Sequence, residues 1–194
     1  VAVLSQGEGV EPTLRGSAVR SGGRGASLTA PNGTGMAKSM VLALEVSLTT
    51  ADNVPGMQAQ GLGSALADPI EINAIMMALG GSRGSQLVVG SHKANVGHSE
   101  APSGLIGCVT ATSALLRKSV ACNAQLRVLN PLLDYIPATH LGQASASLAF
   151  ATGGVELEGV IVSGVTAFGV SGTIGHAVLQ AAEPGDIRVQ GTTL

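Results

Sequence analysis

The chain combines 28 glycines with almost no aromatic residues, and this pairing constrains its interior more than any other feature. Only 2% of the residues are aromatic, whereas 45% are hydrophobic. The interior must therefore be built from Ala, Val and Leu, with glycines that let neighbouring backbones approach closely. This composition favours a tightly layered domain. It excludes a disordered chain, which would need low hydrophobicity and high charge.

Strand and helix patterns alternate along most of the chain. Apolar spacing and capping residues predict helices after Asn32, from Asp68 as the N-cap with Pro69 in the first helical position, and over about 99–118. Large apolar residues available for burial in the last of these are Leu105, Val109, Leu115 and Leu116. Strands are expected at 15–19, 86–89, 147–151, 159–166 and 174–180, the last two joined by a turn over 169–172. The order predicts an α/β fold with a mostly parallel sheet.

The organisation predicts one domain over residues 1–182, with a linker starting at Glu183. The chain opens on an apolar run without basic residues, so a signal peptide is not indicated, and a cytoplasmic location is expected. Residues 159–182 lack Asp, Glu, Lys and Arg and are long enough to span a bilayer. Because this stretch contains five glycines and His176, two buried strands fit better than a membrane span.

Charge and cysteine usage exclude several classes of function. The formal net charge is −2 without a basic run, so nucleic-acid binding has little support. Cys108 and Cys122 form no metal-binding spacing, and no metal is expected. Only 11% of the residues are charged, which leaves little polar surface for a free monomer and favours a large contact with another protein or domain.

Two glycine patterns resemble nucleotide-binding loops but lack the necessary residues. Residues 32–39 are similar to a phosphate-binding loop, but Ala37 stands where a glycine should precede Lys38. Gly61 and Gly63 form half of a dinucleotide-binding pattern, with Leu66 in place of the third glycine. Neither pattern predicts a nucleotide cofactor.

The segment from Gly90 to Gly104 carries the most chemistry. Lys93, Asn95, His98 and Glu100 lie within eight residues, between an expected strand and an expected helix. Loops after parallel strands are common ligand-binding positions. A lysine beside a glutamate can form a buried ion pair, and a nearby cation favours neutral imidazole, which can donate to a developing oxyanion. The alternative is an ordinary polar loop with Ser99 as a helix N-cap.

Four blocks in order give this segment a specific meaning. Residues 93–104 read Lys-x-Asn-x-Gly-His-x-Glu-x-x-x-Gly, which resembles the signature of β-ketoacyl synthases. Residues 16–33 look like a stretch typical of type I polyketide synthases, and 61–71 are similar to a Gly-Thr-Gly-Thr-x-Leu-Gly-Asp-Pro-Ile-Glu block. Residues 168–176 resemble the closing Phe-Gly-x-Ser-Gly-Thr-Asn-x-His block. Together the blocks resemble the C-terminal half of a type I polyketide or fatty-acid ketosynthase.

The resemblance implies a thiolase-like layered fold and a homodimer. It also implies a decarboxylative Claisen condensation, in which a Cys nucleophile takes an acyl chain and two His assist attack by a malonyl-type extender. No cofactor is implied, because the acyl and malonyl groups arrive on the phosphopantetheine of an acyl carrier protein. Catalytic positions here would be Lys93, His98 and Glu100. Pocket positions would be Asn95, Phe168, Gly169, Ser171 and Thr173.

The chain departs from the family pattern at functional positions. The Cys motif of the family's N-terminal half is absent, and Cys108, expected in mid-helix, is no substitute, so this chain contains no nucleophile. Gln60 stands where the first catalytic His would be, and an amide cannot exchange a proton near neutral pH. Ile174 replaces an Asn, and Leu62 and Ser64 replace two Thr.

Three readings remain open. The chain is a ketosynthase fragment that supplies half of an active site with the missing N-terminal half as partner, inactive alone and impaired by Gln60. Alternatively, it belongs to a non-elongating domain that binds acyl chains or acts as a scaffold. Gln60 favours the second reading, whereas intact Lys93, His98 and Glu100 favour the first. The third reading, an unrelated small α/β binding protein, requires the four blocks to match by chance.

Overall fold

The computed structural model describes residues 12–23, 31–81, 83–135, 148–157 and 162–181. The apolar run at the start of the chain and the expected linker from Glu183 lie outside these residues. The helices are α1 (Gly33–Ser47), α2 (Ala67–Leu79), α3 (Lys93–Val96) and α4 (Ser103–Arg117), with short 3-10 turns at Ala51–Asn53 and Pro131–Tyr135. The strands are β1 (Thr13–Ser21), β2 (Gly56–Gln58), β3 (Leu87–Gly90), β4 (Ser119–Val120), β5 (Leu148–Phe150), β6 (Val155–Glu156), β7 (Val162–Phe168) and β8 (Thr173–Gln180).

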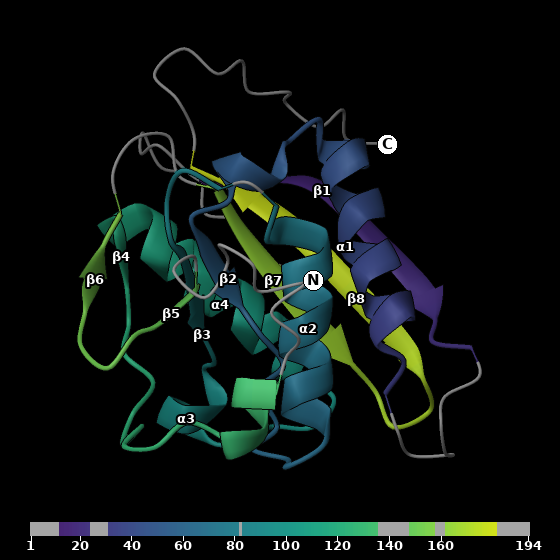
Figure 1. The fold of residues 1–194 in the computed structure, drawn as a ribbon. Coiled ribbons are helices and arrows are strands. Elements are labelled where there is room, and N and C mark those ends of the chain that lie inside the picture. Colours follow the sequence, from purple (N-terminus) through teal and green to yellow (C-terminus); the bar gives the residue numbers. More distant parts are fainter. Residues whose placement is uncertain (1–11, 24–30, 82, 136–147, 158–161, 182–194) are drawn as a thin grey trace.

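A six-stranded sheet in the order β1-β8-β7-β2-β3-β5 forms the centre of the molecule (Figure 1). Strands β7, β2, β3 and β5 run parallel, and β8 and β1 extend the sheet in antiparallel pairs. The mostly parallel sheet with a closing strand pair was expected from the sequence. The predicted strands at 15–19, 86–89 and 174–180 are confirmed within a few residues.

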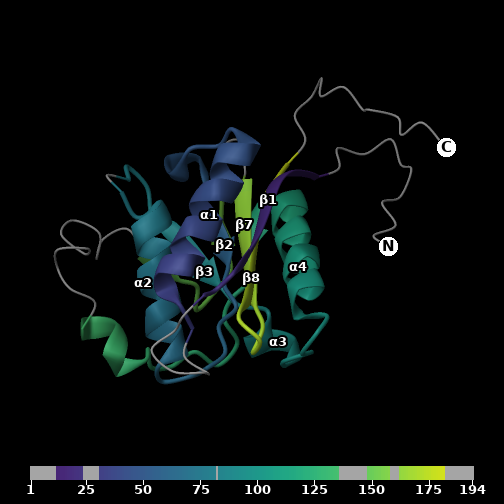
Figure 2. The same cartoon turned by 90° about the vertical axis from the view of Figure 1, so that its right-hand side faces the viewer.

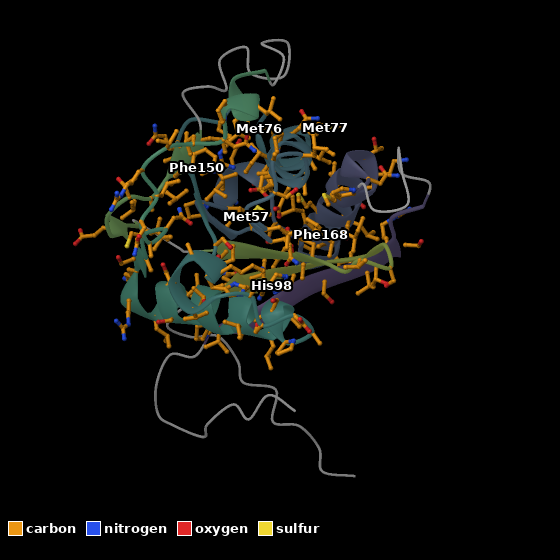
Figure 3. The ribbon with its side chains drawn as sticks, turned by 90° about the horizontal axis from the view of Figure 1, so that it is seen from below. Met57, Met76, Met77, His98, Phe150 and Phe168 are labelled. Carbon is orange, nitrogen blue, oxygen red and sulfur yellow. The ribbon has the colours of Figure 1, made fainter. Side chains whose placement is uncertain are left out.

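Helices cover the two faces of this sheet unequally. Helices α1 and α2 lie on one face and α4 lies on the other, as Figure 2 shows from the side. The larger core cluster fills the space between α1, α2 and the sheet, and its fully buried members include Met36, Met40, Ile75 and Leu79. In Figure 3, Met57 of β2 lies inside this layer.

Close backbone contact brings β1 against α1. A Cβ at Gly16 would lie 2.7 Å from the carbonyl oxygen of Ala43, so only glycine allows this approach. Helix α1 begins as expected, because the side chain of Asn32 accepts a hydrogen bond from the N–H of Gly35. The segment that resembles a phosphate loop is therefore the start of a buried helix.

The predicted start of α2 was wrong. Asp68 is inside the first turn rather than at the N-cap, which is Leu66. The hydroxyl of Ser64 accepts a hydrogen bond from the N–H of Ala67, the first residue of the helix.

The predictions for the region of α4 were partly wrong. Residues 99–102 are not helical: Lys93–Val96 form a separate turn of helix, and Glu100 adopts a positive φ of 56°. Of the four large residues expected to be buried, only Leu115 is, while Leu105, Val109 and Leu116 are exposed. The sheet contacts Gly107, Ala111 and Ala114 instead, since small residues let the helix lie close to β7.

None of the helices in the described ranges is long and apolar enough to cross a membrane. Within the uncharged stretch that required this check, β7 and β8 form the antiparallel pair expected in place of a membrane span.

Candidate active site

Residues from three parallel strands meet at one edge of the sheet. Gln60 follows the end of β2, Lys93 follows the end of β3, and Phe168 is the last residue of β7. Because these strands are parallel neighbours in the order β7-β2-β3, their carboxyl ends lie side by side. The strand order therefore brings together three of the residues that the sequence singled out.

Gln60 connects these three strand ends through its carboxamide. Its side-chain Nε2 donates to the carbonyl oxygen of Phe168 at 3.1 Å, and its Oε1 accepts from Nζ of Lys93 at 3.1 Å. The residue is only 5% exposed. The side-chain amide of Gln60 is thus engaged with protein groups at both ends.

Glu71 of α2 supports the same loop from inside, and the sequence analysis did not single it out. Its carboxyl oxygens accept the backbone N–H groups of Gln60 at 2.7 Å and Gly61 at 2.9 Å. Burial raises the pKa of Glu71 to about 7, although these two hydrogen bonds and Lys93 oppose the shift. A glutamate within the apolar stretch of an expected helix was the signal that could have identified it.

Lys93 is half-buried, and its partner differs from the one predicted. The expected ion pair with Glu100 is absent: the ammonium donates to Gln60, and Glu100 is exposed. Burial lowers the pKa of Lys93, while the attraction of Glu71 opposes this shift. The prediction failed because the positive φ of Glu100 and the end of α3 separate two residues that are close in sequence.

His98 is held in one tautomer by its neighbours. Its Nδ1 accepts the backbone N–H of Glu100 at 2.8 Å and lies 3.1 Å from the hydroxyl of Ser103. Since a backbone N–H is always a donor, Nδ1 is unprotonated and the neutral ring carries its hydrogen on Nε2. His98 can thus donate from Nε2, as a neutral oxyanion-stabilising imidazole must.

The structure does not join His98 directly to Gln60. Figure 3 shows His98 beside α4, with Phe168 and Met57 towards the other helical layer. No hydrogen bond between His98 and Gln60 is present among the described residues. The resemblance assigns both residues to one active site, and we keep as a prediction that they line the same cavity.

Asn95 stabilises its loop through both ends of its side-chain amide. Its Nδ2 donates to the carbonyl oxygen of Cys122 at 3.0 Å, and its Oδ1 accepts the N–H of Ala124 at 2.9 Å. Both ends of its amide are occupied, so these contacts support a structural role. The assignment of Asn95 to the substrate pocket stays a prediction.

The other expected pocket positions lie in or beside the β7–β8 turn. In this turn, Gly169 donates its N–H to the carbonyl oxygen of Thr173 at 2.9 Å, and Gly169 and Ser171 are exposed. Ile174, which replaces the family's Asn, is 2% exposed and belongs to the core cluster under α1. The isoleucine side chain at this position therefore contributes to the hydrophobic core.

His92 is a buried imidazole that the sequence analysis did not single out, whereas His98 is exposed. His92 is 4% exposed and lies against Gly107 of α4. Neither ring nitrogen has a hydrogen-bond partner within the described ranges. Burial lowers the pKa of His92, and the nearby Lys93 and His98 lower it further.

Cys108 does not provide an activated thiol. Cys108 lies in α4, and burial raises the pKa of its thiol, which disfavours the reactive thiolate. Among the described residues, no group of three His, Cys, Asp or Glu side chains is arranged to hold a metal ion.

A family model described as "Beta-ketoacyl synthase, C-terminal domain" matches residues 12–127, more than half of the chain. The chain belongs to this family. The match includes Gln60, Glu71, Lys93 and His98, but it ends before the β7–β8 pair.

Curated relatives extend the likeness over nearly the whole chain. A phenolphthiocerol/phthiocerol polyketide synthase of Mycobacterium tuberculosis is 33% identical over 97% of the chain. Polyketide synthase GfsE of Streptomyces halstedii is 33% identical over 91% of the chain. The chain covers only 8% and 5% of these two proteins. It therefore corresponds to a small part of such a synthase.

Solved structures agree on the fold. The oxazolomycin ketosynthase domain OzmH KS7 of Streptomyces albus matches 91% of the chain with a TM-score of 0.79 at 24% identity. OzmH KS8 matches 89% with a TM-score of 0.72 at 25% identity. The chain covers 30% and 45% of those two structures. The fold is thus that of part of a ketosynthase, as the thiolase-like expectation required.

Proposed function

We propose that this chain supplies the C-terminal half of a ketosynthase active site. Its complete domain would accept acyl groups from a carrier protein and catalyse decarboxylative condensation with a malonyl-type extender. The observation that carries this proposal is the family match combined with the fixed tautomer of His98, whose Nε2 is a donor for a developing enolate oxygen. Lys93 would contribute a cation near that oxygen.

Gln60 supports a second candidate, a non-elongating domain that holds or transfers acyl chains. Its carboxamide is engaged at both ends, by Phe168 and by Lys93, and cannot exchange a proton. Acyl transfer onto a Cys depends on the nucleophile and its oxyanion donors, so that step would persist. Extension would be slow, because losing one such donor typically costs about a hundredfold to a thousandfold in rate.

The two candidates differ in a loading and extension assay. In a complete domain that carries the Cys half, the condensation proposal predicts acyl loading followed by extension with malonyl, whereas the non-elongating candidate predicts normal loading and little extension. Gln60→His should raise extension without changing loading, as measured by mass spectrometry of the carrier-bound products. Robust extension with native Gln60 would contradict the non-elongating candidate. Condensation by the 194-residue chain alone would contradict the half-site proposal, because the chain lacks the Cys motif that the family resemblance requires.

We also propose that the outer side of α4 is the contact with the missing half of the domain. Leu105, Val109 and Leu116 are 59%, 62% and 59% exposed and follow one another at helical spacing. The solved ketosynthases contain more than twice the length that this chain covers, so further chain is available to cover this side. The homodimer and the acyl carrier protein remain proposed partners of the complete domain.

Self-association of the isolated chain tests this contact. We expect the native chain to associate in sedimentation velocity experiments, because an apolar helix face is left uncovered. Changing Leu105, Val109 and Leu116 to Gln should yield monomers with little change in melting temperature. A native chain that is monomeric at high concentration would contradict the proposed contact.

A further inference from the structure

Gln60 forms hydrogen bonds through both its backbone and its side chain. Its backbone N–H donates to Glu71, and its backbone carbonyl accepts from the hydroxyl of Ser91 at 3.4 Å. Its carboxamide reaches Lys93 and the end of β7. Buried polar groups usually need such partners. The partners of Gln60 come from α2, from the segment after β3 and from the end of β7.

Lys93 donates a hydrogen bond to the side chain of Gln60. Within the described part of the chain, Oε1 of Gln60 is the acceptor that its ammonium contacts. Half-burial disfavours the charged amine, and Glu71 attracts it without a direct hydrogen bond. The position of the ammonium is therefore set by the amide of Gln60.

The opposite end of the same amide is fixed to the sheet. Nε2 of Gln60 donates to the carbonyl oxygen of Phe168, where β7 ends. This bond prevents the amide from rotating, since exchanging its ends would point N–H groups at the Lys93 ammonium. The amide thus has one orientation, with oxygen towards Lys93.

We propose that Gln60 is a positioning residue for Lys93, fastening its ammonium between the ends of β2 and β7. A neutral amide suits this task because the Glu71 carboxyl already lies against the same loop, where a second carboxylate would be repelled. Any effect on chemistry passes through Lys93, and that part of the inference rests on the proposed ketosynthase function.

The chain is well suited to a direct test because it contains only three lysines, Lys38, Lys93 and Lys118. Lys38 and Lys118 are exposed and serve as internal references. NMR of nitrogen-labelled lysine side chains then follows each ammonium separately through a pH titration. We expect the native protein to show Lys93 titrating below the ordinary value of a lysine side chain, because burial lowers its pKa.

Gln60→Met removes both hydrogen bonds at similar volume. The Lys93 ammonium should then turn to solvent, and its titration should rise to the ordinary value of a lysine side chain. Gln60→Asn, which is one methylene shorter and cannot reach both partners, gives the same test if the Met variant does not fold. Gln60→Glu should keep the ammonium in place and raise its titration by about one pH unit through direct attraction.

Gln58 provides a matched control. It lies two residues earlier on β2 and is 4% exposed, and its Oε1 has no hydrogen-bond partner in the described ranges. Gln58→Met should leave the Lys93 titration unchanged. An unchanged titration in Gln60→Met, or an equal change in Gln58→Met, would overturn the positioning role. Because the measurement needs no substrate, its outcome is separate from that of the extension assay.

Discussion

The two faces of the central sheet differ in how completely they are packed. Under α1 and α2, the large side chains point inward, and Met36, Met40 and Leu79 are 0% exposed. On the other face, α4 turns Gly107 and Ala111 to the sheet and leaves Leu105, Val109 and Leu116 outside. The face under α1 and α2 is fully packed. The outer side of α4 is instead apolar and exposed, as is typical of a helix that packs against a further layer.

The largest expected effect is a difference in unfolding free energy between two leucines. Leu79→Ala should lower the unfolding free energy by roughly 2–5 kcal/mol, because it leaves a cavity in the packed face under α1 and α2. Leu116→Ala should cost less than about 0.5 kcal/mol in this chain, since its side chain is already exposed. Urea unfolding of both variants measures the contrast.

The same pair of variants sharpens the comparison in a complete domain. There, Leu116→Ala should cost well over 1 kcal/mol, because burial adds about 1.5–3 kcal/mol for a leucine side chain. Equal losses for both leucines in the isolated chain, or no added loss in the complete domain, would show that the two faces do not differ.

The packed face under α1 and α2 also contains two buried titratable groups, whose effects on stability depend on pH in opposite directions. Burial lowers the pKa of His176 to about 4, and its Nδ1 is 2.8 Å from the hydroxyl of Thr166. In unfolded chains, His titrates near 6.5, so the unfolded state binds more protons between about pH 6.5 and pH 4. His176 thus removes stability as pH falls through this window, by about 3 kcal/mol in total.

Glu71 has the reverse sign. Its pKa rises from 4.5 to about 7 on folding, so the folded state binds more protons between these values. Its contribution to stability is present at low pH and is lost as pH rises through about 7, again by about 3 kcal/mol.

The two slopes should nearly cancel in the native chain between about pH 4.5 and pH 6.5. His176→Gln should leave stability that falls as pH rises, and Glu71→Gln should leave stability that rises with pH. Thermal unfolding at several pH values measures both slopes. A steep slope in the native chain that neither variant changes would contradict this assignment.

The smallest expected effect lies on the α4 face. His92 is buried against Gly107 without a hydrogen-bond partner in the described ranges, which is costly for an imidazole. His92→Leu should therefore stabilise the chain by about 1 kcal/mol in denaturant unfolding. His176→Leu is the control and should destabilise, because that ring is bonded to Thr166. A loss of stability in His92→Leu would indicate that its ring has a partner.

The sequence predicted the sheet better than the layers around it. Apolar runs such as 86–89 and turn residues at 169–172 are local signals, and the strands formed there. For α4, helical periodicity was visible, but Leu105 and Val109 were assigned to the wrong side. A fragment of a layered fold can have two apolar helix faces, and sequence alone does not tell which faces its own sheet.

The candidate site was predictable as a set of residues but not as a set of contacts. Lys93, His98 and Gln60 were singled out by their blocks, and the strand order places Gln60 and Lys93 together. The partner of Lys93 was missed, because Gln60 is 33 residues away while Glu100 is near in sequence. Glu71 was missed as a support, because its role depends on where the chain turns after β2.

The central position of β2 has a consequence for how the molecule is made. Its two neighbours are β3, which follows soon after it, and β7, which begins at Val162. While a ribosome is still adding the residues between them, one edge of β2 has no strand to pair with, and such an edge invites pairing with other chains. The bond from Gln60 to Phe168 spans 108 residues and can form only after β7 arrives. The candidate-site end of the sheet is thus completed only when β7 has been made, and a chain stopped before β7 would emerge with an open, aggregation-prone strand and without the bond from Gln60 to Phe168.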